Sequence, residues 1–481
     1  MRKNKLLIFG MLSMSLFWAC STDDNLTESI DETEDAEEVV LDDSDVDNIV
    51  DHDDDADYIW NSSDVVEVSL NGSSVSSSGS GLTIVGSKIT ITNAGNYSFT
   101  GTLDDGQIYV DTEDETIVRL ILNNADITCS NNAAIYVSNA EKVMLVLADG
   151  SSNKVSDGAV YSTDEEDANA AVFSKEDLTV YGDGSLTVTG NYNDGLTSKD
   201  GLIIASGNII VDAVDDGIRG KDYMVINSGD ITVNCDGDGL KSDNIEDEGR
   251  GYITINNGSF DITSGGDAIY AGKDILVLIG EFNLKSGGGS NAYLSSEASA
   301  KSIKSGIISQ FYGGIINIDA ADDGINSDGD IEIYGGTFDV ASGDDGMHSD
   351  VDLIIENAEI TISSSLEGIE AGYITVNSGT IKVTATDDGF NATQGTEVMS
   401  DDGSQLTVNG GTITVNMSGN DVDAMDSNGD ITISGGIVNL YIPTSGPCEG
   451  LDANGTITIG SDATVYENDE VYTGSSSNGG R

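Results

Sequence analysis

The chain contains 481 residues, of which 85 are acidic and 19 are basic, and its formal net charge is −66. A chain this acidic lacks the basic surface that nucleic-acid binding requires, so we exclude nucleic acid as a partner. The excess of carboxylates favours either cation binding or a strongly solvated surface.

The N-terminal segment has the pattern of an export signal. Three basic residues precede an apolar run from Leu6 to Trp18, and Cys20 follows two positions later. The run is too short for a membrane span, so residues 1–20 are predicted to be a signal peptide. Cys20 resembles the lipidated cysteine of bacterial lipoproteins, and residues 21–24 resemble the acidic tag of lipoproteins on the cell surface of Bacteroidetes-type bacteria. We expect an outer-membrane surface lipoprotein that touches the membrane only through its lipid; ordinary secretion is the alternative.

Residues 21–58 are predicted to form a disordered acidic tether. No lysine or arginine occurs between Lys5 and Lys88, and such a segment cannot bury enough apolar surface to fold. His52 lies inside a run of aspartates, where we expect a flexible tail rather than a metal site. With only two histidines in the chain, a histidine-based transition-metal site is not expected.

From about residue 195 to 450 the chain repeats one phrase: an acidic pair, Gly, an apolar residue, a variable residue and a small residue. Gly195, Gly217 and Gly239 are 22 residues apart, and Gly324 and Gly346 repeat that interval. A fixed period of this size indicates a solenoid in which each repeat forms one coil.

Between the phrases, apolar and polar residues alternate, as in Ile231, Val233 and Cys235 against Thr232 and Asn234. This period is typical of strands, and Gly-containing pairs supply the turns. We predict an all-β, single-stranded parallel β-helix of about 22 residues per coil over residues 59–465, followed by a disordered tail at 466–481. Longer intervals predict bulging loops near 243–251, 285–299 and 394–407, which we expect to contribute to a binding surface.

The acidic pairs predict a metal site. If the coils are in register, carboxylates stack about 5 Å apart and repel one another unless a cation neutralises them. Ca²⁺ suits such oxygen ligands better than Mg²⁺, and several ions are expected. The alternative is that the aspartates only shape turns and face water. The predicted ligands are Asp215, Asp216, Asp236, Asp238, Asp322, Asp323, Asp344, Asp345, Glu367, Asp387 and Asp388.

The variable positions predict a second row. In chain order they are Thr197, Arg219, Lys241, Tyr270, Lys304, Asn326, His348, Glu370, Asn391, Asp426 and Asp452. Its basic residues either pair with neighbouring aspartates or meet the carboxylates of an acidic sugar polymer, and tyrosines either stack on sugar rings or form half-buried walls. The predicted carbohydrate-binding residues are Arg219, Lys241, Tyr270, Lys304, Tyr312 and Tyr334.

Several segments resemble a bacterial carbohydrate-binding family of parallel β-helices. They are residues 95–103, 105–111, 118–123, 133–137 and 299–305, together with the repeated Asp-Asp-Gly phrase, and the resemblance covers roughly residues 65–460. It implies a right-handed β-helix with several Ca²⁺ ions between coils, attachment to the cell surface, and binding of plant cell-wall polysaccharides such as cellulose or pectic acid. We therefore predict a monomeric polysaccharide-binding protein rather than an enzyme.

Two alternatives stay open. The family is related in architecture to calcium-dependent pectate lyases, so a pectate or polyuronate lyase with Lys241 as its catalytic base is the first. A metal beside a lysine helps it to lose its proton, which a base requires. The second is a structural surface protein or adhesin in which calcium serves only stability.

Overall fold

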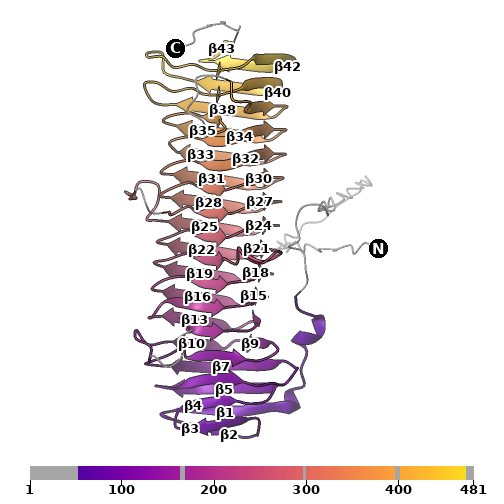
Figure 1. Cartoon of the computed structure of the whole chain (residues 1–481), viewed down its shortest axis with the longest axis vertical. Coiled ribbons are helices and arrows are strands. Elements are labelled where there is room, and N and C mark those ends of the chain that lie inside the picture. Colours follow the sequence, from indigo (N-terminus) through magenta and orange to yellow (C-terminus); the bar gives the residue numbers. More distant parts are fainter. Residues whose placement is uncertain (1–51, 163–167, 296–298, 396–400, 473–481) are drawn as a thin grey trace, which may run out of the picture. The chain divides into compact units, whose positions relative to one another are not determined.

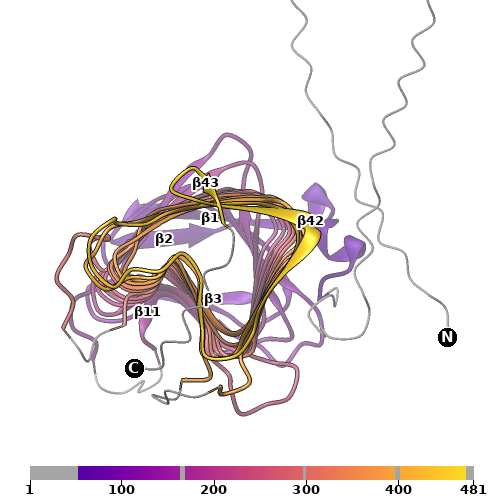
Figure 2. The same ribbon diagram turned by 90° about the horizontal axis from the view of Figure 1, so that it is seen from above.

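The computed structural model describes residues 52–162, 168–295, 299–395 and 401–472. The predicted signal peptide, Cys20 and most of the predicted tether lie outside these residues. The described chain is a parallel β-solenoid of about 14 turns, which confirms the predicted fold class. Figure 1 shows the strands stacked in columns, and Figure 2 shows the coils superimposed along the stack. Among the described residues, no helix has the length and apolarity to cross a membrane.

One turn of the solenoid contains three strands. In the coil that begins after Asp216, they are β17 (Ile218–Gly220), β18 (Tyr223–Ile226) and β19 (Asp230–Cys235). Each pairs in parallel with its equivalent one coil later, β20, β21 and β22. We call the three resulting stacks columns 1, 2 and 3. The acidic pair lies at the turn from column 3 to column 1, which we call the acidic corner.

Column 1 holds the short strands that follow the acidic corner. They are β6 (Gln107–Asp111), β8 (Ile135–Asn139), β11 (Ala170–Ser174), β14 (Asp194–Ser198), β17, β20 (Leu240–Ser242), β23 (Ile269–Ala271), β26 (Ile303–Ser305), β29 (Ile325–Ser327), the starts of β32 (Met347–Ile355) and β34 (Ile369–Val376), β36 (Phe390–Ala392), β39 (Asp426–Ser427) and β41 (Asp452–Ala453).

Column 2 holds β9 (Val143–Leu147), β12 (Leu178–Tyr181), β15 (Gly201–Ile204), β18, β21 (Tyr252–Ile255), β24 (Asp274–Val277), β27 (Ile308–Phe311), β30 (Asp330–Ile333), the ends of β32 and β34, β37 (Gln405–Val408), and the starts of β40 (Asp430–Tyr441) and β42 (Ile457–Glu467). Column 3 holds β10 (Ser152–Ser156), β13 (Ser185–Gly190), β16 (Asn208–Ala213), β19, β22 (Ser259–Ser264), β25 (Glu281–Ser286), β28 (Ile315–Ala320), β31 (Thr337–Ser342), β33 (Glu359–Ser364), β35 (Thr380–Ala385), β38 (Thr412–Met417), and the ends of β40 and β42.

The first and last coils carry antiparallel additions. β1 (Val65–Gly72) pairs with β2 (Ser74–Ser77), β3 (Leu82–Val85) with β4 (Lys88–Ile91), and β42 with β43 (Glu470–Val471). β5 (Gly95–Leu103) and β7 (Val118–Thr128) lead into the regular coils, and two short 3-10 helices, η1 (Asp55–Tyr58) and η2 (Ser62–Asp64), precede β1. These hairpins satisfy part of the backbone that an open edge strand would leave unpaired.

The core is a continuous stack of inward-facing apolar side chains, because every second residue of a strand points inward. Equivalent positions of successive coils touch: the rings of Phe260 and Phe282 stack with their centroids 4.6 Å apart. The column 2-to-3 turn needs glycine, since Gly229 has φ of 134°, a region that other residues rarely adopt. Stacking of neighbouring coils is therefore what buries the core.

Two predicted boundaries differ from the structure. Residues 52–58, expected in the tether, lie against column 2, because Lys142 forms ion pairs with Asp53 and Asp57. The expectation that His52 belongs to a flexible tail was wrong, since its ring stacks on Tyr223. At the other end, strand pairing continues beyond residue 465 to β43.

The three predicted loops all lie between strands. They occupy residues 243–251, 287–302 and 393–404, of which 296–298 and 396–400 lie outside the described part. The first and third join column 1 to column 2, whereas the second joins column 3 to column 1. The loops therefore project from two different corners of the coil.

Candidate functional site

The register confirms that the variable positions form one row along column 1. Each pairs with the next, from Thr197 to Asp452. The aromatic residues Tyr109, Tyr136 and Phe173 extend the same row toward the first coil. A fixed period, with an inward apolar residue before each position and an inward small residue after it, directs these side chains away from the core.

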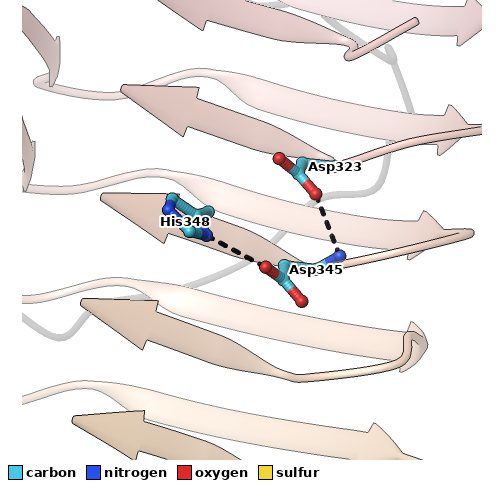
Figure 3. Close-up of side chains that lie close together, drawn as sticks. All are labelled: Asp323, Asp345 and His348. Carbon is cyan, nitrogen blue, oxygen red and sulfur yellow. Dashed lines mark hydrogen bonds and ion pairs between the residues drawn. The ribbon is translucent and has the colours of Figure 1, made fainter. Parts of the chain in front are cut away.

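The second acid of several pairs has a backbone role that the sequence did not reveal. The Oδ1 atom of Asp323 accepts a hydrogen bond from the backbone N–H of Asp345, the equivalent residue one coil later, at 3.1 Å (Figure 3). Asp216 accepts from Asp238 at 3.0 Å in the same way, and so does Asp388 from Asp423. The acid therefore satisfies a backbone donor that would otherwise be unpaired at the turn.

In the first part of the corner, the other carboxylate oxygen of these acids faces a lysine. Lys241 Nζ lies 3.0 Å from Asp216 Oδ2 and 2.8 Å from Asp238 Oδ2. One coil of the corner carries Lys301 in place of the second acid, and its Nζ lies 2.7 Å from Asp323 Oδ2 and 3.0 Å from Asp322 Oδ2. Asp216, Asp238 and Asp323 therefore each use Oδ1 for a backbone hydrogen bond and Oδ2 for an ion pair.

This arrangement changes the reading of the first four predicted metal ligands. Lys241 occupies the position between Asp216 and Asp238 where a metal was expected. Asp215 accepts a hydrogen bond from Asn193 at 3.0 Å, and Asp236 is exposed. These four residues are near one another, but the chain's own lysine provides the positive charge.

The middle of the corner combines a histidine with carboxylates. His348 Nδ1 lies 3.0 Å from Asp345 Oδ2, and its Nε2 lies 3.2 Å from Asp350. The hydrogen bond to Asp345 raises the pKa of His348 to about 9, and burial raises the pKa of Asp345 to about 7. Ligand atoms lie within 4.8 Å of one another in three groups here: Asp323, Asp345 and His348; Asp322, Asp323 and Asp344; and Asp345, Glu367 and Glu370.

The last part of the corner has carboxylates without a cationic side chain. Residues 383–472 contain no lysine, arginine or histidine. Asp423, Asp426 and Asp452 bring one carboxylate oxygen each within 4.8 Å of one another. Burial, followed by the charges of neighbouring carboxylates, raises the pKa of Asp426 to about 8 and contributes to a pKa of about 7 for Asp388 and Asp423.

These groups have the chemistry of a calcium site. Ca²⁺ takes six to eight oxygen ligands in flexible geometry, and carboxylate oxygens are among the ligands it prefers. Sequence reasoning named five residues of these groups but did not include His348, Glu370, Asp423, Asp426 and Asp452. The signal was present, since four of them stand in the variable row and the fifth, Asp423, stands three residues before it, where an i,i+3 pair shares one side of the corner. Asp387 is exposed and belongs to none of the four groups.

The predicted carbohydrate-binding residues fall into two places. Tyr270 lies in the row between Lys241 and Lys304, whose Nζ atoms are 5.9 and 5.7 Å from its ring centroid. Arg219 makes a forked contact with Asp243 at 2.7 and 2.9 Å. Tyr312 and Tyr334 are elsewhere, after column 2, where their rings stack at 4.6 Å. The structure therefore places Arg219, Lys241, Tyr270 and Lys304 in one row, and it places Tyr312 and Tyr334 apart from that row.

Lys241 is poorly placed to act as a base. Burial disfavours its charge, but Asp238 and Asp216 outweigh that effect and raise the pKa of Lys241 well above its usual value. A general base needs a pKa near the working pH. In this arrangement, the ammonium group keeps its proton.

The fold and the corner define a parallel β-solenoid whose stacked carboxylates line one edge. A family model described as "Carbohydrate-binding domain-containing protein" matches residues 85–346 and 344–478, and the chain belongs to this family. A relative of that name from Acetivibrio thermocellus is 41% identical over 136 residues, which are 28% of this chain and 48% of the relative. The chain thus spans about half the length of this curated relative.

One solved structure is also similar. It is described as a polysaccharide lyase-like protein from C. thermocellum, in a gadolinium derivative, and it is 28% identical to this chain. The match covers 56% of this chain and 96% of that one, with a TM-score of 0.45.

Proposed function

We propose that this protein binds polysaccharide of the plant cell wall through the outer face of column 1. Membership of the carbohydrate-binding family supports this function class. The observation that carries the proposal is the continuous row in which Tyr270 lies between Lys241 and Lys304. An aromatic face stacks on a sugar ring, and flanking polar groups bond its hydroxyls.

The experiment is affinity gel electrophoresis against cellulose-derived, xylan and pectic polymers. The wild type is expected to be retarded by at least one of them. Tyr270→Ala is expected to reduce the retardation strongly, whereas Tyr334→Ala, which alters a tyrosine outside column 1, is the matched control. Equal retardation of all three proteins would move the binding surface away from column 1.

We propose further that several Ca²⁺ ions stabilise the corner from Asp322 to Asp452. The support is the set of carboxylate groups in that stretch, three of which contain acidic residues alone, together with the absence of basic residues from 383 to 472. An acidic polymer would be repelled by the net charge of −66 unless calcium bridged the two sets of carboxylates, while a neutral glucan would not need such bridges. Binding assays with and without calcium therefore separate a pectic ligand from a neutral one.

Surface anchoring is part of the same proposal. Cys20 follows the basic and apolar segments of an export signal, so we expect its lipidation and display on the outer membrane. Metabolic labelling with a fatty acid, compared between the wild type and Cys20→Ser, tests this. Label incorporated equally by both proteins, or by neither, would contradict it.

A polysaccharide lyase is the second candidate function. The observation in its favour is a lysine in contact with two aspartates, Asp216 and Asp238, and the opposing one is the raised pKa of Lys241. Incubation with polygalacturonate and Ca²⁺, followed through the absorbance of unsaturated products, separates them. We expect no product at high protein concentration. If polymer binding also fails, the remaining interpretation is a structural surface protein or adhesin.

A further inference from the structure

A flat aromatic site lies on the outer face of column 2, away from the acidic corner. Tyr223 and Tyr252 are paired neighbours on successive coils, with ring centroids 5.8 Å apart. The imidazole of His52 stacks on Tyr223 at 3.7 Å with the planes only 12° apart. Its Nε2 lies 2.6 Å from the Tyr252 hydroxyl. The site therefore already holds a planar polar ring, supplied by the chain itself.

Charged groups surround this ring site. Asp177 accepts a hydrogen bond from the Tyr223 hydroxyl at 3.2 Å. Arg250 lies with its guanidinium carbon 5.8 Å from the Tyr223 centroid and pairs with Asp222 at 3.5 Å. Burial and the neighbouring carboxylates of Asp177 and Asp222 raise the pKa of Asp200 to about 6. Arg250 comes from the loop at 243–251, one of the loops expected to contribute to a binding surface.

His52 is not the main attachment of its segment. We call residues 52–60 the strap; Figure 1 shows the strap region in indigo beside the stacked strands. Lys142 pairs with Asp53 and Asp57, Arg119 donates to the backbone carbonyl of Asp57 at 2.6 Å, and Tyr58 packs edge-on against Tyr181 at 4.9 Å. The imidazole can therefore leave Tyr223 while the strap stays attached. Burial also lowers the pKa of His52, which favours the neutral form of the docked ring.

We propose that Tyr223, Tyr252, Asp177, Asp200, Asp222 and Arg250 form a binding subsite for a neutral sugar ring, and that His52 occupies this subsite when no polysaccharide is bound. The inference rests on the proposed polysaccharide binding and names a second contact surface for it. An aromatic floor with carboxylate and guanidinium partners at its rim is the arrangement that holds a ring with hydroxyl groups at its edge. Three carboxylates against one guanidinium disfavour a uronate and favour an uncharged hexose.

The test compares full-length variants by isothermal titration calorimetry with cellohexaose. His52→Ala is expected to tighten binding about tenfold, the ratio that follows if the self-occupied form makes up about nine-tenths of the free protein. Tyr223→Leu in the His52→Ala background is expected to weaken binding at least tenfold, because it keeps apolar bulk but loses the flat ring. Tyr373→Leu, on the same outer row of column 2, is the matched control and should leave affinity unchanged.

Asp200→Asn covers the case in which Tyr223→Leu perturbs folding. Its side chain is 39% exposed, so we expect a normal fold and about threefold weaker binding in the His52→Ala background. Unchanged or weaker affinity of His52→Ala for cellohexaose would overturn the subsite. So would an affinity that neither Tyr223→Leu nor Asp200→Asn changes. If those variants leave retardation by a wild-type-binding polymer intact, only the subsite fails; if no polymer retards any variant, the proposed function fails as well.

Discussion

The first and last parts of the acidic corner differ in how the charges of their stacked carboxylates are compensated. Between Asp216 and Asp323, lysines of the chain neutralise the inner carboxylates: Lys241 contacts two of them and Lys301 contacts a third. Between Asp388 and Asp452 no basic residue exists, and the carboxyl pKa values rise to about 7 or 8. The backbone hydrogen bond from the next coil is the same at both ends.

The comparison separates two roles of one residue type. The Oδ1 hydrogen bond gives the acid a structural role in the coils where it forms, and it acts without any metal. The Oδ2 charge is what needs a partner, because like charges on successive coils lie close together. In the first part of the corner, lysine side chains of the chain itself compensate this charge. In the last part, only bound protons or a free cation can compensate it. The predictions below test that division.

Calcium removal is expected to have the largest effect and to act on one end. At a free concentration one hundred times its dissociation constant, a bound ion stabilises by about 2.7 kcal/mol, so losing two ions would cost about 5 kcal/mol. Hydrogen exchange with and without chelator should show lost protection in β36 to β42 but not in β14 to β22. Uniform loss along the solenoid, or none, would contradict the division.

Replacing the built-in cation is expected to rank second. Lys301→Met keeps the aliphatic stem but leaves Asp322 and Asp323 without their partner, which should cost about 3 kcal/mol in the free energy of unfolding without metal. Added calcium should restore part of this loss. Lys285→Met is the control, because its pair with Asp319 is nearly half exposed and should contribute less than about 1 kcal/mol. Equal losses in urea unfolding would refute the prediction.

The converse substitution should transfer the lysine arrangement to the last coils. Asp426→Lys places an ammonium group three residues after Asp423, as Lys241 follows Asp238, with Asp388 on the preceding coil. We expect a gain of about 2 kcal/mol for the metal-free protein and a smaller response to calcium. Asp426→Asn removes the charge without adding a cation and should gain less. A thermal melt in chelator ranks the three proteins, and a loss of stability in Asp426→Lys alone would count against the interpretation.

The smallest effect is a dependence of stability on pH without calcium. Asp388, Asp423 and Asp426 have folded pKa values of about 7 to 8, above the unfolded value of about 3.9. Groups raised on folding stabilise fully below the unfolded pKa, and this stabilisation is lost as pH rises through the folded values. Stability should therefore fall between about pH 4 and pH 8, by about 1 kcal/mol in total after solvent screening.

The control is the calcium-saturated protein, in which bound ions keep these groups ionised. Its urea-unfolding free energy should change little from pH 7 to pH 8. A metal-free protein whose stability rises over pH 4 to 8 would show that these carboxyls are not the strained groups.

The amino-acid sequence by itself determined the coil and its register. A constant interval, with Ile231 and Val233 inward and Thr232 and Asn234 outward, allows only one stacking in which every coil buries its apolar face. That register also predicted the whole variable row from Thr197 to Asp452, and it predicted that Asp322, Asp323, Asp344 and Asp345 lie together. These properties repeat along the chain, so they can be read without knowing any distance.

Only the tertiary structure decided which carboxylates have a partner. Lys241 reaches Asp216 on the preceding coil, Lys301 replaces an acid at the corner, and the variable row and the acidic pair turn out to share one side. The strap is a second example, because His52 stacks on Tyr223, 171 positions away in the numbering. No repeat in the sequence predicts this contact. Contacts that occur once depend on the reach and direction of single side chains, and a repeat pattern carries no information about either.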